Sequence, residues 1–312
     1  MVGSFWPSNL SPMVARCSLL ATNISGSYLH RNILKIPRGF GELFVRQLRA
    51  AGDNVIATGR NADSRLAHLK DLGAALLELD VTASVEVLQA KIDEAWEVYP
   101  GGIDVVVNNA GYILSGAFEE LTQQDFESSM MTNFHGPLSI TRAILPKLRA
   151  KGKGTLLYVS SQAAWHGDPS AAAYCSSKFA LEGALECLAK ELAIFAPGLQ
   201  VLIVEPGYFR IKAFNNILHV EPRVPDYAQF NASVRQVEAA TIGNEPGDPE
   251  KGVSLMIDLV KGTGAVAGRS MPLRVPLGSD GWGRIKAKCE ETLTICNEWE
   301  ELAKSTDFES AV

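Results

Sequence analysis

The stretch Asp104-Val105-Val106-Val107-Asn108-Asn109-Ala110-Gly111 joins a short β-branched run to two amides and two small residues. A run that is apolar throughout is typical of a strand covered on both faces by helices, as in a parallel sheet. Amides and small residues directly after such a strand suit a place where a flat ligand lies against the backbone. Taken alone, the tetrapeptide 108–111 is equally compatible with a plain strand-ending turn.

Short β-branched runs alternate with amphipathic helical stretches from Gly39 onward, which is the pattern of β-α-β units. We therefore predict an α/β fold, a single domain with a Rossmann-type, doubly wound parallel sheet. The predicted strands span residues 54–58, 75–79, 105–107, 154–159 and 200–204. The predicted helices span residues 41–51, 84–98, 122–148 (whole or interrupted) and 174–193.

Composition narrows the class of protein. With 312 residues, 46% of them hydrophobic and 21% charged, the chain matches an ordinary globular enzyme. A net charge of −6 argues against a nucleic-acid partner or an anionic membrane surface, which need a basic stripe. No apolar run approaches the ~20 residues of a membrane span, and the first twenty residues make a poor signal peptide. Five cysteines without a C-x-x-C pair indicate reduced thiols and no metal site, so we expect a cytoplasmic protein.

Tyr174 and Lys178 stand four residues apart at the start of a predicted helix, and such positions share one helix face. A free tyrosine has a pKa near ~10, and a cation held nearby favours its phenolate, which makes the phenol a better proton shuttle. For the pair alone, a solvated helix face is the more frequent explanation. The rest of the chain decides between the two.

Three stretches are candidates for binding a dinucleotide. Gly39-Phe40-Gly41, ahead of a helical stretch, looks like the end of a glycine-rich turn, where N–H groups and the helix dipole bind phosphate. Arg60 follows a predicted strand at a place where arginine pairs with a 2′-phosphate, so it favours NADP over NAD. Asp80 ends the next strand and could accept a hydrogen bond from adenine. A solvated arginine and a helix-capping aspartate are the plainer alternatives.

Asn133 and Gly136 interrupt the helical pattern of residues 122–148. Both residues lower helix propensity without an evident local gain. The conflict predicts a kink that serves function.

In this order and spacing, these motifs resemble the short-chain dehydrogenase/reductase family over about residues 39–210. The resemblance implies a seven-stranded parallel sheet, a nicotinamide cofactor and a homodimer or homotetramer. It implies that Tyr174 is the general acid/base, that Lys178 lowers the pKa of Tyr174 and binds the nicotinamide ribose, that Ser161 holds the substrate oxygen and that Asn133 holds a relay water. The expected cofactor-binding residues are Gly39, Gly41, Arg60, Asp80, Asn108, Ala110, Gly111, Tyr174, Lys178, Pro206 and Gly207.

Two features depart from the family pattern. Lys35 stands where the turn T-G-x-x-x-G-x-G has its first glycine, and the stretch Gly26 to Pro37 interrupts the first strand–turn–helix unit. We interpret this stretch as a splicing or gene-model artefact or, alternatively, as a surface loop; the apolar run that starts at Ser18 is then the first strand. Ile211 replaces a threonine that binds the nicotinamide amide in many relatives.

The predicted organisation is a disordered segment (residues 1–17), the oxidoreductase domain (18–280) and a terminal helix and tail (281–312). Within the domain, the apolar residues near 211–246 suggest a substrate lid, although ordinary core helices would show the same pattern. We predict an NADP-dependent oxidoreductase for a carbonyl or alcohol substrate of apolar character. The alternative is a catalytically idle NADP-binding or sensing protein with a damaged phosphate loop.

Overall fold

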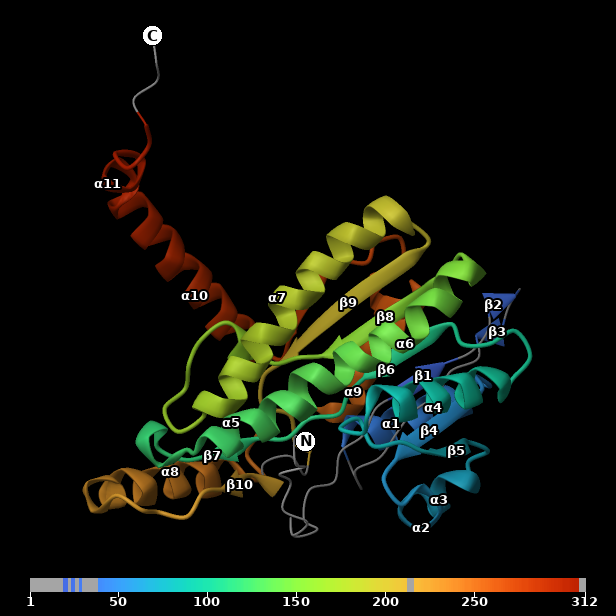
Figure 1. The fold of residues 1–312 in the computed structure, drawn as a ribbon, viewed down its shortest axis with the longest axis horizontal. Coiled ribbons are helices and arrows are strands. Elements are labelled where there is room, and N and C mark those ends of the chain that lie inside the picture. Colours follow the sequence, from blue (N-terminus) through green and yellow to red (C-terminus); the bar gives the residue numbers. More distant parts are fainter. Residues whose placement is uncertain (1–18, 22–23, 26–27, 30–38, 212–215, 309–312) are drawn as a thin grey trace, which may run out of the picture.

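A twisted central sheet organises the computed structural model, which describes residues 19–21, 24–25, 28–29, 39–211 and 216–308 (Figure 1). The strands follow each other across the sheet in the order β5-β4-β1 and β6-β8-β9-β11, and β1 also packs beside β6. Their bounds are β1 (Leu19–Ala21), β4 (Val55–Gly59), β5 (Ala75–Glu78), β6 (Val105–Asn108), β8 (Gly154–Val159), β9 (Leu199–Pro206) and β11 (Arg274–Leu277). The α/β class and the predicted strands are confirmed.

The pairs β4–β5, β6–β8, β8–β9 and β9–β11 are parallel, so their carboxyl ends meet at one edge of the sheet. Strand β6 is buried along its whole length, and its side chains alternate between two cores. Val105 and Val107 belong to the core on one face, whereas Val106 belongs to the core on the other face. This double burial explains why the sequence of the strand is apolar throughout.

Strand β1 departs from the expected topology. It occupies the expected central place, but it runs antiparallel to β4, with Leu19 opposite Ala57 and Ala21 opposite Val55. Its carboxyl end therefore lies where β4 begins, at the opposite edge from the ends of the parallel strands. A short hairpin of β2 (Ile24–Ser25) and β3 (Tyr28–Leu29) follows. The expected all-parallel sheet is thus corrected at this strand; Lys35, most of the stretch 26–37 and the segment 1–17 lie outside the described residues.

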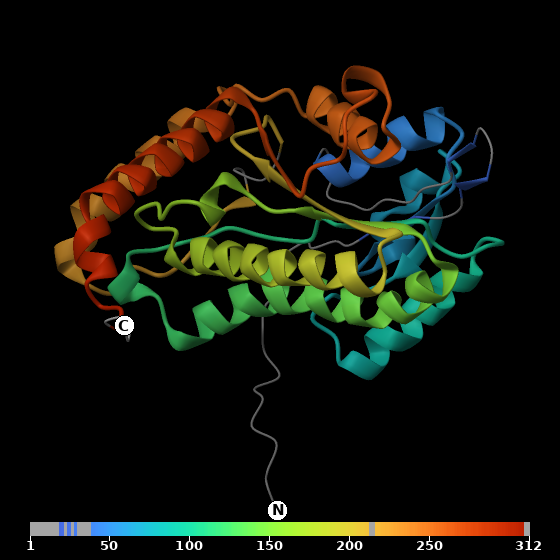
Figure 2. The same cartoon turned by 90° about the horizontal axis from the view of Figure 1, so that it is seen from above.

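Two helical layers cover the sheet (Figure 2). On one face lie α4 (Val85–Glu97), α6 (Gly136–Lys151) and α7 (Ala172–Phe195), and on the other lie α1 (Phe40–Ala50) and α9 (Pro249–Lys261). Shorter helices among the described residues include α2 (Ala62–Arg65), α3 (Ala67–Lys70), η1 (Phe118–Glu120), η3 (Gln162–Ala164) and η6 (Gly264–Val266).

The predicted kink is present between α5 (Gln123–Met130) and α6, where Met131–His135 forms a π-helical turn called η2. Thr122 and Asp125 cap the start of α5 reciprocally. At the end of the turn, Gly136 lies against Val81, and a Cβ atom on Gly136 would come 3.0 Å from the Val81 side chain and carbonyl oxygen. The glycine therefore permits a close approach of the helix to the end of β5, and the asparagine sits in the widened turn.

Beyond the sheet, a small parallel pair of β7 (Leu114–Ser115) and β10 (Leu218–His219) leads to η5 (Pro225–Tyr227) and α8 (Ala228–Thr241). The chain ends in α10 (Ser279–Glu298) and α11 (Glu300–Lys304), which extend away from the sheet in Figure 1. Among the described residues, none of the helices has the length and hydropathy required to cross a bilayer.

Candidate active site

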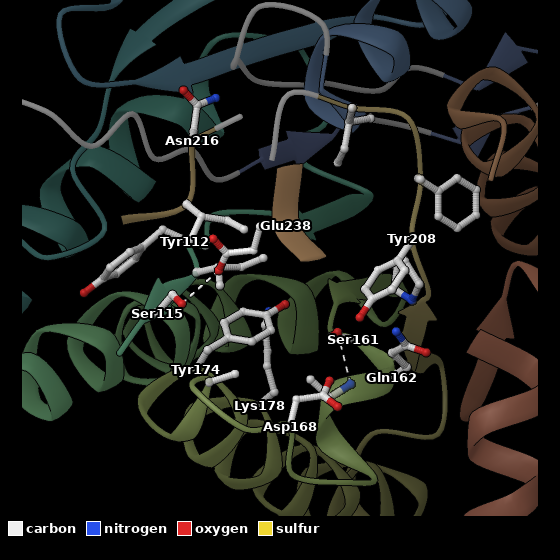
Figure 3. A pocket seen from close by; sticks show the side chains of 18 of the residues that line it. Tyr112, Ser115, Ser161, Gln162, Asp168, Tyr174, Lys178, Tyr208, Asn216 and Glu238 are labelled. Carbon is white, nitrogen blue, oxygen red and sulfur yellow. Dashed lines mark hydrogen bonds between the residues drawn. The ribbon is translucent and has the colours of Figure 1, made fainter. Parts of the chain in front are cut away.

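A cavity of about 1130 Å³ opens at the edge of the sheet where the parallel strands end. Loops that follow β4, β6, β8 and β9 form its walls, together with the start of α1 and one side of α8 (Figure 3). Its lining includes these residues expected from the sequence: Gly39, Gly41, Arg60, Gly111, Ser161, Tyr174, Lys178, Pro206 and Gly207. Asp80, Asn108, Ala110 and Asn133 are not among the lining residues.

Tyr174 lies in the first turn of α7 and Lys178 one turn later. The Lys178 Nζ atom is 5.8 Å from the centre of the Tyr174 ring, so the two side chains share one helix face as the spacing predicted. Lys178 is buried, and Nζ donates a hydrogen bond of 2.9 Å to the carbonyl oxygen of Val159 at the end of β8. This bond ties the helix to the strand that carries Ser161.

Burial controls the proton affinities of both groups. It raises the pKa of Tyr174 to about 12, and a hydrogen bond with Ser161 offsets part of that rise. Burial lowers the pKa of Lys178 to about 8, against the opposing charge of Glu182. In the protein alone the phenol is therefore protonated at neutral pH, which is the form that can donate a proton to a carbonyl oxygen.

Ser161 begins the single turn η3, where its hydroxyl accepts a hydrogen bond of 3.1 Å from the backbone N–H of Ala163. The hydroxyl also meets the phenol of Tyr174. The serine is thus held by its own loop and faces the tyrosine inside the cavity (Figure 3). Such a pair can bracket one oxygen atom of a ligand.

Asn133 is buried beside the cavity, where its side-chain amide hydrogen-bonds two separate segments of the chain. Its amide accepts from the Tyr112 backbone N–H and donates to the Tyr112 carbonyl oxygen, both at 3.1 Å. It also donates to the Ser177 hydroxyl at 3.0 Å. Asn133 therefore joins the loop after β6 to α7, and a Cβ atom on neighbouring Gly111 would approach its Oδ1 atom to 3.3 Å.

The other end of the cavity fits a dinucleotide. Gly39 precedes α1 in an extended conformation and lines the cavity together with Gly41, so the start of this helix, with its dipole, faces the space where a phosphate would bind. At Gly111 and Gly207 the backbone packs closely against neighbouring side chains. A Cβ atom on Gly207 would come 2.4 Å from the Asp280 carboxylate. Ile211 lines the same cavity, in the place noted for the departure from threonine.

Arg60 and Asp80 lie together at the ends of β4 and β5, and form an ion pair of 3.7 Å. Asp80 also accepts hydrogen bonds from the backbone and hydroxyl of Thr82. Arg60 and a second arginine, Arg65, both line the cavity. The sequence interpretation missed Arg65, whose place in the short helix α2 brings it beside the loop after β4.

Asn108 ends β6 in a fully buried position, and neither polar atom of its side chain has a hydrogen-bond partner among the described residues. Ala110 is packed into the core. Both residues thus support the cavity from behind rather than line it. The signal that could have separated them from Gly111 is burial, which the tetrapeptide does not encode by itself.

A buried pair of carboxyl groups behind the catalytic residues had no counterpart in the sequence interpretation. Glu182 of α7 accepts a hydrogen bond of 2.5 Å from Ser160, and Glu205 of β9 accepts one of 2.9 Å from the Trp165 indole. Arg274 of β11 donates to Glu182 at 3.1 Å and lies 3.6 Å from Glu205. Burial and the neighbouring Glu182 raise the pKa of Glu205 to about 8. The pair therefore holds both ends of the loop that carries Ser161.

Further residues missed from the sequence line the substrate side: Tyr112, Ser115, Gln162, Asp168, Tyr208 and Glu238. Asp168 forms an ion pair with Arg284 of α10 and lies 3.5 Å from His166, to which the sequence assigned no role. In the part of the chain that the structure describes, no three His, Cys, Asp or Glu residues are grouped to hold a metal ion.

Known proteins share this sequence and architecture. A family described as short chain dehydrogenase matches residues 36–221. Oxidoreductase BOA17 of Botryotinia fuckeliana is 31% identical over 85% of this chain and 94% of its own length. A short-chain dehydrogenase structure from Streptomyces avermitilis has a TM-score of 0.75 at 31% identity, covering 88% of this chain and 97% of that one. The structure of a gluconate 5-dehydrogenase from Burkholderia cenocepacia with NADP and tartrate has a TM-score of 0.54 at 25% identity, covering 60% and 74%.

Proposed function

The chain belongs to the short-chain dehydrogenase/reductase family and is an oxidoreductase, and from that premise we propose that it interconverts a carbonyl and an alcohol with NADP. The observation that carries the proposal is the meeting of Ser161, Tyr174 and Lys178 in one cavity with Gly39 and Gly41 at the start of α1. A protein that only bound nucleotide would not need the first three. The idle alternative is accordingly not favoured.

Each residue has a defined part in the proposal. Tyr174 transfers a proton to the carbonyl oxygen, or takes it back from the alcohol, and Ser161 donates a hydrogen bond to the same oxygen. Lys178 places a positive charge beside the phenol and the ribose, and so favours the phenolate that follows proton transfer. The cofactor supplies the hydride chemistry, so the protein has to orient and polarise. Gly39, Gly41, Gly111, Pro206 and Gly207 would hold it.

NADP is the proposed cofactor because two arginines line the cavity near the end of β4. Arg60 can leave its half-buried pair with Asp80, since an ion pair still reached by solvent contributes only about 0–1 kcal/mol. A bidentate contact between Arg60 and a 2′-phosphate is stronger. Asp80, freed from the pair, stays beside the adenosine end. A homodimer or homotetramer and a cytoplasmic location stay predictions.

The test is a titration of the purified protein with NADPH and with NADH, read by cofactor fluorescence, followed by a panel of aldehydes, ketones, steroids and retinoids. We expect tighter binding of NADPH and oxidation of NADPH with at least one carbonyl class. Binding of NADPH without turnover of any carbonyl would contradict the catalytic part. Equal affinity for the two cofactors would contradict the NADP assignment.

A further inference from the structure

Helix α8 (Ala228–Thr241) borders the part of the cavity where we place the substrate. The face of α8 that lines the cavity carries one acidic residue, Glu238, among mostly apolar or neutral side chains. Helix α8 has no fully buried residue, and it lines the cavity with one side only. The lining residues recur at helical spacing: Phe230, Ser233, Val234, Val237, Glu238 and Thr241. Glu238 therefore lies on the cavity side of the helix, and only 17% of its side-chain surface is accessible to solvent.

Two contacts from outside α8 position the Glu238 carboxylate. The Ser115 hydroxyl of β7 donates to one oxygen at 2.9 Å, and the His219 ring of β10 contacts the other oxygen at 2.7 Å. A carboxylate has about four acceptor sites, so two partners leave it able to accept further hydrogen bonds. The Ser115–Glu238 bond is drawn in the cavity view of Figure 3. The geometry is that of a fixed acceptor rather than of a solvated surface charge.

Basic groups are placed elsewhere around the described cavity lining. Arg60 and Arg65 follow β4 at the cofactor end, and Lys178 is bonded to the end of β8. On the substrate side, the ionisable acids that line the cavity are Asp168 and Glu238; the former is neutralised by Arg284, which is not a lining residue. A substrate carboxylate or phosphate would meet the Glu238 carboxylate there, with His219 beside it charged only when protonated, whereas a hydrogen-bond donor would meet an acceptor.

We propose that Glu238, positioned by Ser115 and His219, binds a hydrogen-bond-donating substituent of the substrate, a hydroxyl or a protonated amine. The substrate is then an amphipathic hydroxy- or amino-ketone, or the matching alcohol. Its apolar part lies against Phe230, Val234 and Val237. This inference rests on the proposed carbonyl chemistry, and it replaces a wholly apolar substrate with one that carries a second polar group.

The test uses ketones that are identical except at the end of the chain, which carries a methyl, a hydroxymethyl, an ammoniomethyl or a carboxylate group, at several chain lengths. At the best length we expect kcat/KM for the hydroxymethyl or ammoniomethyl ketone to exceed that of the methyl ketone about tenfold or more, because a hydrogen bond to a charged group contributes about 1.5–3 kcal/mol. The carboxylate ketone should be the poorest substrate.

In Glu238→Gln, the ratio of kcat/KM for the ammoniomethyl ketone to that for the methyl ketone should fall about tenfold. The carboxylate ketone should become a better substrate relative to the methyl ketone. Asp226→Asn removes the same charge from an exposed position in η5, directly before α8. This control variant should keep the ratios of turnover among the four ketones that the unmodified protein has. A parent protein that prefers the methyl ketone would overturn the inference. So would an equal loss on all four ketones in Glu238→Gln, which would show that the carboxylate only fastens α8. Absence of turnover with every ketone would instead contradict the proposed function.

Discussion

Two strand–loop–helix units deliver the site, and they differ in how firmly the fold holds them. In the unit β8–η3–α7, the strand is bonded in parallel on both sides, and buried side chains tie its loop to α7 and β9. In the unit β1–α1, a three-residue strand runs antiparallel to β4, and the residue at the N-cap of α1 is Gly39, which has no side chain to bond the helix start. In the proposed function, the first unit carries the proton chemistry, whereas the second carries the phosphate site.

The difference teaches which part of the function tolerates change in the chain. A catalytic oxygen must be positioned closely, and the hydrogen bonds of Ser161 to its own loop and of Lys178 to the end of β8 hold these side chains in place. A phosphate site depends on the position of a helix start, and Gly39 and Gly41 at the start of α1 line the cavity although β1 is reversed. We therefore expect changes in the first unit to abolish turnover, and changes in the second to alter cofactor affinity.

The largest expected effect belongs to the first unit. Tyr174→Phe removes the hydroxyl that exchanges the proton and should lower kcat by about 10²–10⁴-fold. NADPH affinity should stay close to that of the parent, because the hydroxyl acts in the transition state. Single-substrate kinetics and a fluorescence titration measure the two quantities. Lys178→Ala should lose both turnover and affinity; turnover of Tyr174→Phe within a few-fold of the parent would refute the assignment.

The buried carboxyl pair predicts how stability depends on pH. Glu205 keeps its proton in the folded protein up to about pH 8, whereas the ordinary value is 4.5. Between these two values the folded state binds more protons than the unfolded state. The contribution of Glu205 to the free energy of unfolding is therefore complete below pH 4.5, falls as the pH rises and is lost above about pH 8. The slope is at most about 1.4 kcal/mol per pH unit.

Glu205→Gln keeps a neutral donor in that place and should flatten the dependence of melting temperature on pH across this window. The matched control, Glu191→Gln, changes an exposed acid of α7 and should keep the slope of the parent. A variant Glu205→Gln with the parental slope would show that Glu205 does not titrate between these two values in the folded protein.

In the second unit, Arg60→Asp should reverse the cofactor preference, since a charge-assisted contact of about 1.5–3 kcal/mol corresponds to a ten- to hundredfold ratio. The ratio of dissociation constants for NADPH and NADH measures it. Arg149→Asp makes the same charge change on the exposed end of α6 and serves as the control. An unmodified protein that binds both cofactors equally would remove the basis of this prediction.

The smallest expected effect is on affinity alone. Deleting Gly26 to Pro37 joins Ser25 to Arg38, so the first strand leads directly into the glycine turn once it reverses to run parallel to β4. Recovery of one backbone hydrogen bond to phosphate, about 0.5–1.5 kcal/mol, would tighten NADPH binding about three- to tenfold and raise the melting temperature. Deleting residues 1–17 should leave both values unchanged. If the shorter loop leaves them unchanged or worse, the stretch belongs to the native structure and the artefact interpretation is wrong.

Much of the fold follows from local pattern. The short apolar runs become β4, β5, β6, β8 and β9, which helices cover on both faces except at the partly buried β5, and the conflict at Asn133 and Gly136 becomes the turn η2. The direction of β1 was not predictable in this way. A short apolar run is compatible with either direction, since pairing depends on the neighbouring strand and on the chain that connects it.

The sequence by itself determined the α/β class, the kink and the shared face of Tyr174 and Lys178, because each depends on residues a few positions apart whose spacing sets their direction. Only the tertiary structure decided that Arg274 meets Glu182, 92 positions away, and that Ser115 meets Glu238, 123 positions away. Burial against distant elements also decided that Glu205 keeps its proton. Such contacts depend on how strands and helices pack, and therefore on the whole chain at once.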